Sequence, residues 1–297
     1  GSVVSPSRME RMMGREGELV LVDGQVSPLL RGQAGERERW RVVNACSSRY
    51  LSLRLPGQET RVVGRDVGRL AVPASLDQVV LAPGNRLDLI IDLTEGQSEL
   101  VAVPVDRGQM MGGMMGRGGR GGGGVGPEDS ERPLARLQVG SGRGAAAGGP
   151  PPGGGAEEVP LADLREVRVD ERRRLTFQMS MVGMMGGGGP MDFTLDGLSY
   201  DPDRTDQRVR LGTVEEWTIG NDGPLDHPFH LHVWPMQLIE TAGERLDVPV
   251  WLDVVNVPAG GSVTVRIRFA DFGGRTVYHC HILDHEDLGM MGTILVE

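Results

Sequence analysis

All six histidines of the chain lie in two short segments in its C-terminal third. In chain order, the two segments read His227-Pro-Phe-His230-Leu-His232 and His279-Cys280-His281-Ile-Leu-Asp-His285-Glu-Asp-Leu-Gly-Met290. Imidazole nitrogens and thiolates are typical transition-metal ligands. Isolated histidines usually pack in a core or lie at the surface, but such clustering around a cysteine favours a metal site.

Strand geometry indicates which of these side chains can meet. Neighbouring side chains on a β-strand point to opposite faces, so His279 and His281 would share one face and Cys280 the other. His230 and His232 would likewise share a face, whereas His227 is free to point the opposite way. We therefore predict two sites, back to back across one strand layer.

The donors on the two faces differ in chemistry. Two histidines, one cysteine and a weak axial methionine form a blue-copper electron-transfer site; the residues concerned are His227, Cys280, His285 and Met290. Gly289 allows the tight approach that the loop ligand Met290 needs. The other face collects only nitrogen donors, suited to further copper ions: His230, His232, His279 and His281. Zinc is the competing interpretation, but a single cysteine among His-X-His pairs matches no structural zinc spacing.

The segments around these residues have the pattern of β-strands. Apolar side chains alternate, for example at Leu51, Leu53 and Leu55, and turn-forming pairs such as Pro56-Gly57 separate the runs. No window offers a long helix with a period of 3.6 residues. The pattern is typical of β-sandwiches, so we predict an all-β fold.

An internal repeat indicates that one sandwich was duplicated. Residues 35–44 resemble residues 212–221, and residues 81–91 resemble residues 257–267. The offset is 177 residues from Gly35 to Gly212 and 176 from Gly84 to Gly260. Because the two offsets nearly agree, duplication explains the matches better than coincidence does.

Low-complexity sequence separates the two copies. Residues 108–126 are rich in Met, Gly and Arg, and residues 140–155 are rich in Gly, Ala and Pro, so neither stretch can bury a core. The predicted organisation is an N-terminal segment or interdomain-linker remnant at 1–16, a first domain at 17–140 with a Met/Gly-rich loop at 108–126, a linker at 141–160, and a metal-binding domain at 161–297.

Composition excludes several classes of function. The 297 residues carry a net charge of −10, which argues against nucleic acid or an anionic membrane surface as the main partner. No lysine occurs, so lysine-nucleophile chemistry is excluded. No apolar run approaches the ~20 residues of a transmembrane helix. Cys46 is expected to be a buried free thiol, and Asp253 to serve a turn.

The two histidine motifs resemble those of the multicopper oxidases, the family of laccases, ascorbate oxidase and bacterial copper oxidases. The whole chain resembles their second and third domains. The resemblance implies two cupredoxin-like Greek-key β-sandwich domains joined by a Gly/Pro-rich linker. It also implies copper as the cofactor and a periplasmic or secreted location. The chain begins Gly1-Ser2 without a leader, so we expect any targeting segment to have been lost upstream.

Carried over residue by residue, the resemblance assigns roles to these side chains. The type 1 copper ligands would be His227, Cys280, His285 and Met290, the type 2 ligand His230, and the type 3 ligands His232, His279 and His281. Glu286 resembles the carboxylate implicated in proton delivery to reduced oxygen; its alternative is a solvated surface acid.

Two further groups are candidates for substrate binding. A Met-rich segment near the type 1 site marks cuprous oxidases in the family, and thioethers favour Cu(I). The matching region runs from Met179 to Met191, and its candidate residues are Met179, Met181, Met184 and Met185. The alternative for this segment is a low-complexity loop. Asp222 and Asp226 could help to dock a cationic substrate, or could simply be solvated loop acids.

The chain departs from the family in its number of histidines. The trinuclear centre of the family takes eight, four of them from an N-terminal domain, and this chain has no motif for those four. We expect a copper-free first domain, a complete type 1 site, half of a trinuclear site, and the N-terminal cupredoxin domain of the same protein as partner.

The resemblance also implies an activity. Electrons from Cu(I), or from small phenolic or aromatic-amine reductants, would enter at type 1 copper and reduce dioxygen to water at the trinuclear cluster. Two alternatives stay open: an isolated type 1 electron-transfer or binding module, and a two-domain enzyme like nitrite reductase. The absence of histidine from the first domain argues against the latter.

Overall fold

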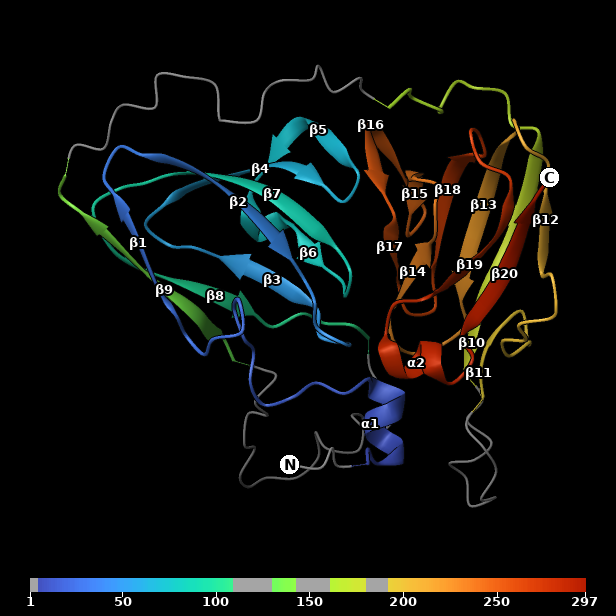
Figure 1. Ribbon diagram of the computed structural model, residues 1–297, viewed down its shortest axis with the longest axis horizontal. Coiled ribbons are helices and arrows are strands. Elements are labelled where there is room, and N and C mark those ends of the chain that lie inside the picture. The colour runs from blue at the N-terminus through green and yellow to red at the C-terminus, as the bar shows by residue number, and fades with distance from the viewer. Residues whose placement is uncertain (1–4, 109–129, 143–160, 180–191) are drawn as a thin grey trace.

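The computed structural model describes residues 5–108, 130–142, 161–179 and 192–297. It contains two bodies built from β-sheets that lie side by side, as Figure 1 shows, and the predicted all-β fold is confirmed. Most of the predicted loop at 108–126 and of the predicted linker at 141–160 falls outside the described residues. The exact domain boundaries therefore stay predictions.

The first sandwich pairs a five-stranded sheet, ordered β1-β9-β8-β3-β6, with a four-stranded sheet, ordered β2-β7-β4-β5. A short 3-10 helix, η1, accompanies the strands. The elements are β1 (Leu29–Gln33), β2 (Arg37–Val43), β3 (Leu51–Arg54), β4 (Glu59–Arg65), β5 (Gly68–Ala74), η1 (Leu76–Gln78), β6 (Val80–Leu81), β7 (Arg86–Asp92), β8 (Gly96–Val103) and β9 (Arg132–Gly140). Leucine, valine and isoleucine side chains such as Leu53, Val62 and Ile91 fill the space between the sheets.

The second sandwich pairs a six-stranded sheet, ordered β11-β10-β13-β18-β15-β16, with a five-stranded sheet, ordered β12-β20-β19-β14-β17. Its elements are β10 (Glu171–Met179), β11 (Phe193–Leu195), β12 (Gln207–Val209), β13 (Val214–Asn221), β14 (His227–Leu231), β15 (Met236–Thr241), β16 (Glu244–Leu252), β17 (Val254–Val257), β18 (Ser262–Arg268), β19 (Gly274–Cys280), α2 (Leu283–Asp287) and β20 (Met291–Val296). Aromatic side chains such as Phe177, Trp217 and Phe229 dominate this core.

The sequence repeat corresponds to equivalent strand pairs in the two sandwiches. β2 pairs with β7 as β13 pairs with β18, both antiparallel. An asparagine ends the repeated segment in each copy. The backbone N–H of Asn44 donates to the carbonyl of Asn85 at 2.9 Å, and that of Asn221 donates to the carbonyl of Gly261 at 2.9 Å. The offset in sequence is thus preserved at the level of single hydrogen bonds.

The N-terminal segment adds a short helix, α1 (Arg8–Met13), which lies beneath α2 in Figure 1. A capping box begins it: the Glu10 backbone N–H donates to Ser7 Oγ at 3.2 Å, and the Ser7 backbone N–H donates to the Glu10 carboxylate at 2.6 Å. The sequence predicts no long helix, and this short one begins at a Ser-x-x-Glu signal.

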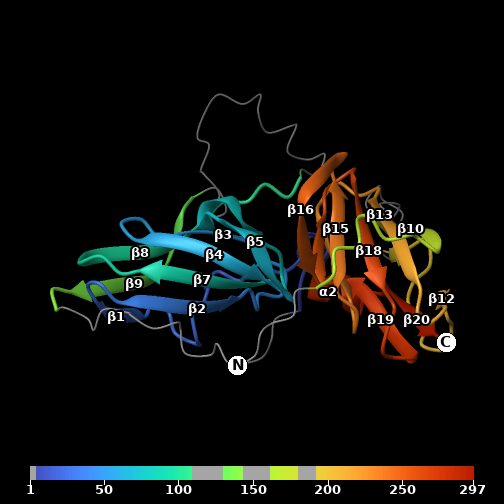
Figure 2. The ribbon, with the colours of Figure 1, turned by 90° about the horizontal axis from the view of Figure 1, so that it is seen from above.

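The two sandwiches meet chiefly at the edge strands β16 and β5. Figure 2 shows β16 of the second sandwich turned toward β4 and β5 of the first, and the side chain of Trp251 packs against Gly68. Within the described residues, no helix has the length and apolar character needed to cross a bilayer.

Candidate metal centre

Strands β14 and β19 carry most of the candidate ligands and lie side by side in one sheet. They pair antiparallel, with Phe229 opposite Cys280 and His230 opposite His279. This register places the ligand atoms in two separate groups, one on each face of the sheet. The members are His227, Cys280 and His285 in one group and His230, His232 and His279 in the other.

The first group is sealed from solvent. His227 Nδ1 lies 3.5 Å from Cys280 Sγ, His285 Nδ1 lies 3.7 Å from it, and the two Nδ1 atoms are 3.2 Å apart. All three residues have 0% of their surface exposed. Burial lowers the pKa of His285 to about 4 and raises that of the Cys280 thiol. The imidazole therefore stays neutral at pH 7, which is the form that binds a metal.

The N-terminal segment fixes the His285 ring. The backbone carbonyl of Met12 accepts a hydrogen bond from His285 Nε2 at 3.1 Å. A carbonyl can only accept, so the ring proton sits on Nε2 and the lone pair of Nδ1 faces the group. Phe193 stacks on the ring with its centroid 4.6 Å away. Ring position and tautomer thus both favour ligation through Nδ1.

Backbone hydrogen bonds hold Met290 beside this group. Its N–H donates to the carbonyl of His285 at 2.9 Å, and its carbonyl accepts from the N–H of Cys280 at 3.0 Å. Gly289 adopts φ +109°, and a Cβ there would lie 3.1 Å from the Cβ of Ser199. Met290 is fully buried. Its role as a fourth ligand stays a prediction.

The second group presents the Nε2 atoms of its rings. His232 Nε2 lies 3.0 Å from His279 Nε2. His230 Nδ1 donates to the carbonyl of Asp253 at 2.7 Å, and His279 Nδ1 donates to the carbonyl of Cys280 at 2.9 Å. Because each Nδ1 carries its proton toward a carbonyl, Nε2 is left as the metal-binding atom of both rings.

His281 and Glu286 lie beside this second group. The His281 ring is centred 5.4 Å from that of His230, but its ligand atoms do not converge with the group, and its Nε2 lies against Gly84 of the first sandwich. A Glu286 carboxylate oxygen lies 3.2 Å from His279 Nδ1. This hydrogen bond lowers the pKa of Glu286. The side chain is 29% exposed, so Glu286 contacts the cluster rather than facing only solvent.

The candidate substrate residues are only partly placed. Asp222 is exposed and accepts from Gln178 Nε2 at 3.2 Å. Both carboxylate oxygens of Asp226 accept hydrogen bonds, from Asn256 Nδ2 at 2.7 Å and from the Ala259 N–H at 2.9 Å, so Asp226 ties loops together. Met179 packs at the edge of the aromatic core. The other candidates lie outside the described residues: Met181, Met184 and Met185.

The structure corrects the expectation for Cys46 and adds a contact to the one for Asp253. Cys46 is a free thiol, as predicted, but it is half-buried at the margin of the first core rather than buried. Asp253 does lie at a bend between β16 and β17, but its carboxylate also forms an ion pair with Arg86 of the first sandwich. The pairing escaped the sequence because no local pattern links residues so far apart in the chain.

The main features that sequence reasoning missed are backbone carbonyls, those of Met12 and Asp253. Arg107 is a third. Its guanidinium donates to the carbonyls of Ser48 and Met13, each at 3.0 Å, and so ties the N-terminal segment to the first sandwich. Every residue type carries a carbonyl, so composition gives no signal for such a role.

The donor chemistry of the first group fits copper. Two imidazole nitrogens and one cysteine sulfur converge in a pocket closed to water, and this is the His2Cys set of blue-copper sites. His227 directs its Nδ1 at the group, and its Nε2 finds no hydrogen-bond partner among the described residues.

Comparison with known proteins agrees with this donor set. Models of the multicopper oxidase family match residues 9–101 and 169–297. The chain belongs to the multicopper oxidase family. A solved multicopper oxidase from Campylobacter jejuni, described as a metallo-oxidase, is 30% identical and superposes with a TM-score of 0.76 over 97% of this chain and 59% of its own. The family's cupredoxin fold and its copper cofactor thus apply to this chain.

Two curated relatives of this multicopper oxidase chain span nearly all of it. A laccase of Bacillus stratosphericus is 29% identical over 93% of the chain, and a multicopper oxidase of Staphylococcus haemolyticus is 26% identical over 95%. The chain covers 54% and 53% of these relatives, about half of their length.

Proposed function

We propose that this chain forms the type 1 copper site and half of the trinuclear site of an oxidase that reduces dioxygen to water. The observation that carries the proposal is the convergence of His227 Nδ1, Cys280 Sγ and His285 Nδ1 within 3.7 Å of one another. Met290 is proposed as the axial ligand.

The protein prepares these donors before any metal arrives. The Met12 carbonyl and the Phe193 ring fix His285, and the surrounding core excludes water. Bound copper would supply one-electron redox chemistry at the Cys280 group and dioxygen reduction at the histidine group. The ligands themselves are held in place, so little reorganisation accompanies a change of charge.

His279 and His281 flank Cys280, so a covalent path of adjacent residues joins the two groups. We assign His230 as the type 2 ligand and His232, His279 and His281 as type 3 ligands. Glu286 is proposed to deliver protons to this cluster, since its carboxylate contacts His279. The remaining histidines of the cluster would come from an N-terminal cupredoxin domain of the same protein.

The electron donor is proposed to be Cu(I) or a small phenolic or aromatic-amine compound. The description of the Campylobacter jejuni relative as a metallo-oxidase and the methionines at 179–191 favour Cu(I), whereas the laccase relatives favour phenols. Replacing the methionines at 181–191 with leucine should lower Cu(I) oxidation by the intact enzyme more than phenol oxidation. We further propose a periplasmic or secreted location, which suits handling of extracellular copper.

The sharpest test of the proposed function is the visible spectrum of the copper-loaded chain. Only a buried thiolate bound to Cu(II) produces an intense visible band here, so Cys280→Ser should abolish it. Cys46→Ser is the matched control, because it removes the only other thiol. Equal colour in the Cys280 variant, or loss of colour in the Cys46 variant, would contradict the type 1 assignment.

An electron-transfer module is the second candidate function. It is favoured by the first sandwich, which contains no histidine and so cannot complete the cluster. Oxygen consumption distinguishes the two functions. The oxidase requires that adding the N-terminal domain to the copper-loaded chain starts dioxygen reduction, whereas a module would exchange electrons and consume no oxygen with the domain present.

A further inference from the structure

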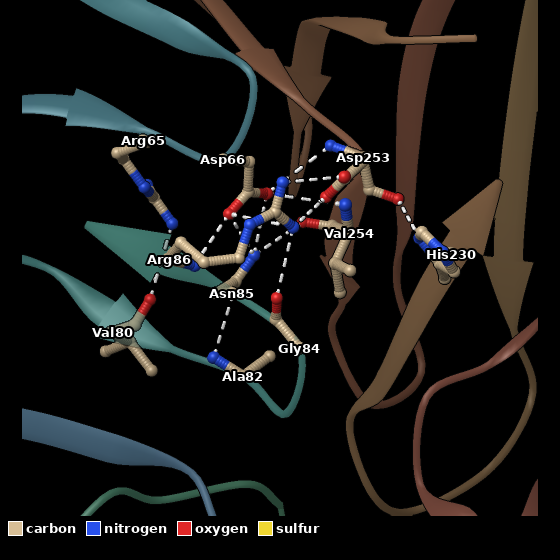
Figure 3. Close-up of polar contacts among 10 residues, drawn as sticks. All are labelled: Arg65, Asp66, Val80, Ala82, Gly84, Asn85, Arg86, His230, Asp253 and Val254. Carbon is tan, nitrogen blue, oxygen red and sulfur yellow. Dashed lines mark hydrogen bonds and ion pairs between the residues drawn. The ribbon is translucent and has the colours of Figure 1, made fainter. Parts of the chain in front are cut away.

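A partly buried ion pair joins the first sandwich, which contains no histidine, to the candidate trinuclear site. Arg86 begins β7 of the first sandwich, and its guanidinium grips the carboxylate of Asp253 with two hydrogen bonds, of 2.6 and 2.8 Å (Figure 3). Bidentate arginine–carboxylate pairs combine strength with a fixed geometry. Asp253 lies between β16 and β17 of the second sandwich.

The carboxylate of Asp66 fixes the backbone at Arg86. Its side chain is 0% exposed, and one carboxylate oxygen accepts from the backbone N–H of Arg86 at 2.9 Å. The other accepts from Asn85 Nδ2 at 2.9 Å. The same Nδ2 also donates to the carbonyl of Val254 at 3.0 Å, across the boundary between the sandwiches. The turn that carries Arg86 is therefore rigidly docked on the second sandwich.

The network reaches a candidate ligand through one peptide group. The N–H of Val254 donates to Asp66 at 3.4 Å, and the carbonyl of the same peptide, from Asp253, accepts from His230 Nδ1 at 2.7 Å. A peptide group is planar and its N–H and C=O point in opposite directions. Fixing the N–H from the first sandwich therefore aims the carbonyl at His230.

We propose that Arg86, supported by the hydrogen bonds of Asp66, is a positioning residue for His230. The first sandwich fixes the Asp253–Val254 peptide group by hydrogen bonds. The carbonyl of that peptide accepts the Nδ1 proton of His230, so Nε2 is left to bind metal. This inference rests on the proposed metal site. It gives the first sandwich a role in assembling a cluster to which it contributes no ligand.

The test follows both the His230 ring and the metal in the full chain. Arg86→Gln removes the charged fork, and Arg86→Lys keeps the charge but not the bidentate geometry. In the metal-free chain, long-range 1H–15N spectra of labelled histidines report the tautomer of His230. Titration with Cu(II) reports the affinity of the histidine cluster, and the visible band reports the Cys280 group.

We expect Arg86→Gln to convert His230 from the Nδ1–H form to a mixture of tautomers and to weaken Cu(II) binding at the cluster by about 10- to 100-fold. The Cu(II) affinity of Arg86→Lys should lie between those of Arg86→Gln and the unchanged chain. The visible band of the Cys280 group should persist in both Arg86 variants. The matched control is Arg37→Gln, because Arg37 pairs with Asp92 at the opposite, exposed end of β7. The control should change neither readout.

An unchanged His230 tautomer and a cluster affinity within about twofold of the original would overturn the proposal, as would an equal loss in Arg37→Gln. If Arg86→Gln does not fold, Asp253→Asn replaces it, since that change keeps the backbone carbonyl and removes the carboxylate. Failure of the proposed function is separable. A chain without the visible band would refute the copper assignment, while the tautomer of metal-free His230 would still test the positioning role.

Discussion

Trp40 in the first sandwich and Trp217 in the second stand at equivalent positions of the repeat, on β2 and β13. Each indole N–H donates to the glutamate two residues earlier, Glu38 at 2.6 Å and Glu215 at 2.8 Å. Yet Trp217 is wholly buried, whereas Trp40 packs only at the margin of its core. The frame was duplicated, and the packing around it diverged.

The divergence follows the metal ligands. All five phenylalanines of the chain lie in the second sandwich, and two of them support histidine rings: Phe177 is centred 5.2 Å from His227, and Phe193 4.6 Å from His285. The first sandwich, with an aliphatic core, has no histidine to hold. Flat, stiff rings fill the space around a ligand without letting it rotate, which suggests that the aromatic core serves the site as well as stability.

The same contrast appears in the repeated turns at Gly84 and Gly260, both with positive φ. A Cβ on Gly84 would lie 2.6 Å from His281 Nε2, whereas a Cβ on Gly260 would meet no described atom within 4 Å. In the first sandwich, this turn packs directly against the candidate ligand His281 of the second sandwich.

The largest expected difference between the sandwiches is their response to acid in the metal-free chain. Burial lowers the pKa of His285 and of His230 to about 4. Histidines in the unfolded chain have pKa values near 6.5, so the unfolded chain takes up protons first as the pH falls. The free energy of unfolding of the second sandwich should therefore drop between about pH 6.5 and 4. We expect a loss of about 3 kcal/mol for each of these two histidines.

The first sandwich should not share this loss, because it has no histidine and burial raises the pKa of Asp66. A raised carboxyl pKa makes the folded state bind protons first and therefore adds stability as the pH falls. Hydrogen exchange in denaturant at several pH values gives a free energy for each sandwich. Equal losses of stability in both sandwiches would contradict this prediction.

The tryptophan pair should give the next largest effect. Trp217→Ala removes a fully buried indole and should destabilise the second sandwich by about 3–5 kcal/mol. Trp40→Ala should cost the first sandwich clearly less, since its indole is half-buried. Denaturant unfolding followed by circular dichroism measures both. Equal costs would show that the two positions are packed alike.

The glycine pair should give the smallest change in stability and the most local one. Gly260→Ala should cost about 1–2 kcal/mol, the strain of a side chain at positive φ. Gly84→Ala adds a clash with His281 and should also weaken Cu(II) binding at the histidine cluster. Calorimetry and Cu(II) titration of both variants check this. If Gly260→Ala weakens Cu(II) binding equally, the docked turn has no special role.

Much of the site could be read from the sequence because strand alternation depends only on spacing. His279-Cys280-His281 had to split between two faces, and the repeat placed the strands that carry these residues. The sequence could not predict contacts made by groups without a sequence signature. These are the hydrogen bonds of the Met12 carbonyl with His285 and of the Asp253 carbonyl with His230, and the ion pair between Arg86 and Asp253 that joins the sandwiches. The contacts of Asp226 could not be predicted either, because a loop carboxylate has the same sequence pattern whether it faces solvent or ties loops together.

Among the described residues, the two groups of converging metal donors lie in the second sandwich, one on each face of the β14–β19 pair. Anomalous diffraction at the copper edge from crystals of the copper-loaded chain tests this placement most directly. We expect a strong peak between His227, Cys280 and His285, a second, weaker peak among His230, His232 and His279, and none in the first sandwich. A missing peak at Cys280, or an ordered copper ion between the sheets of the first sandwich, would contradict it.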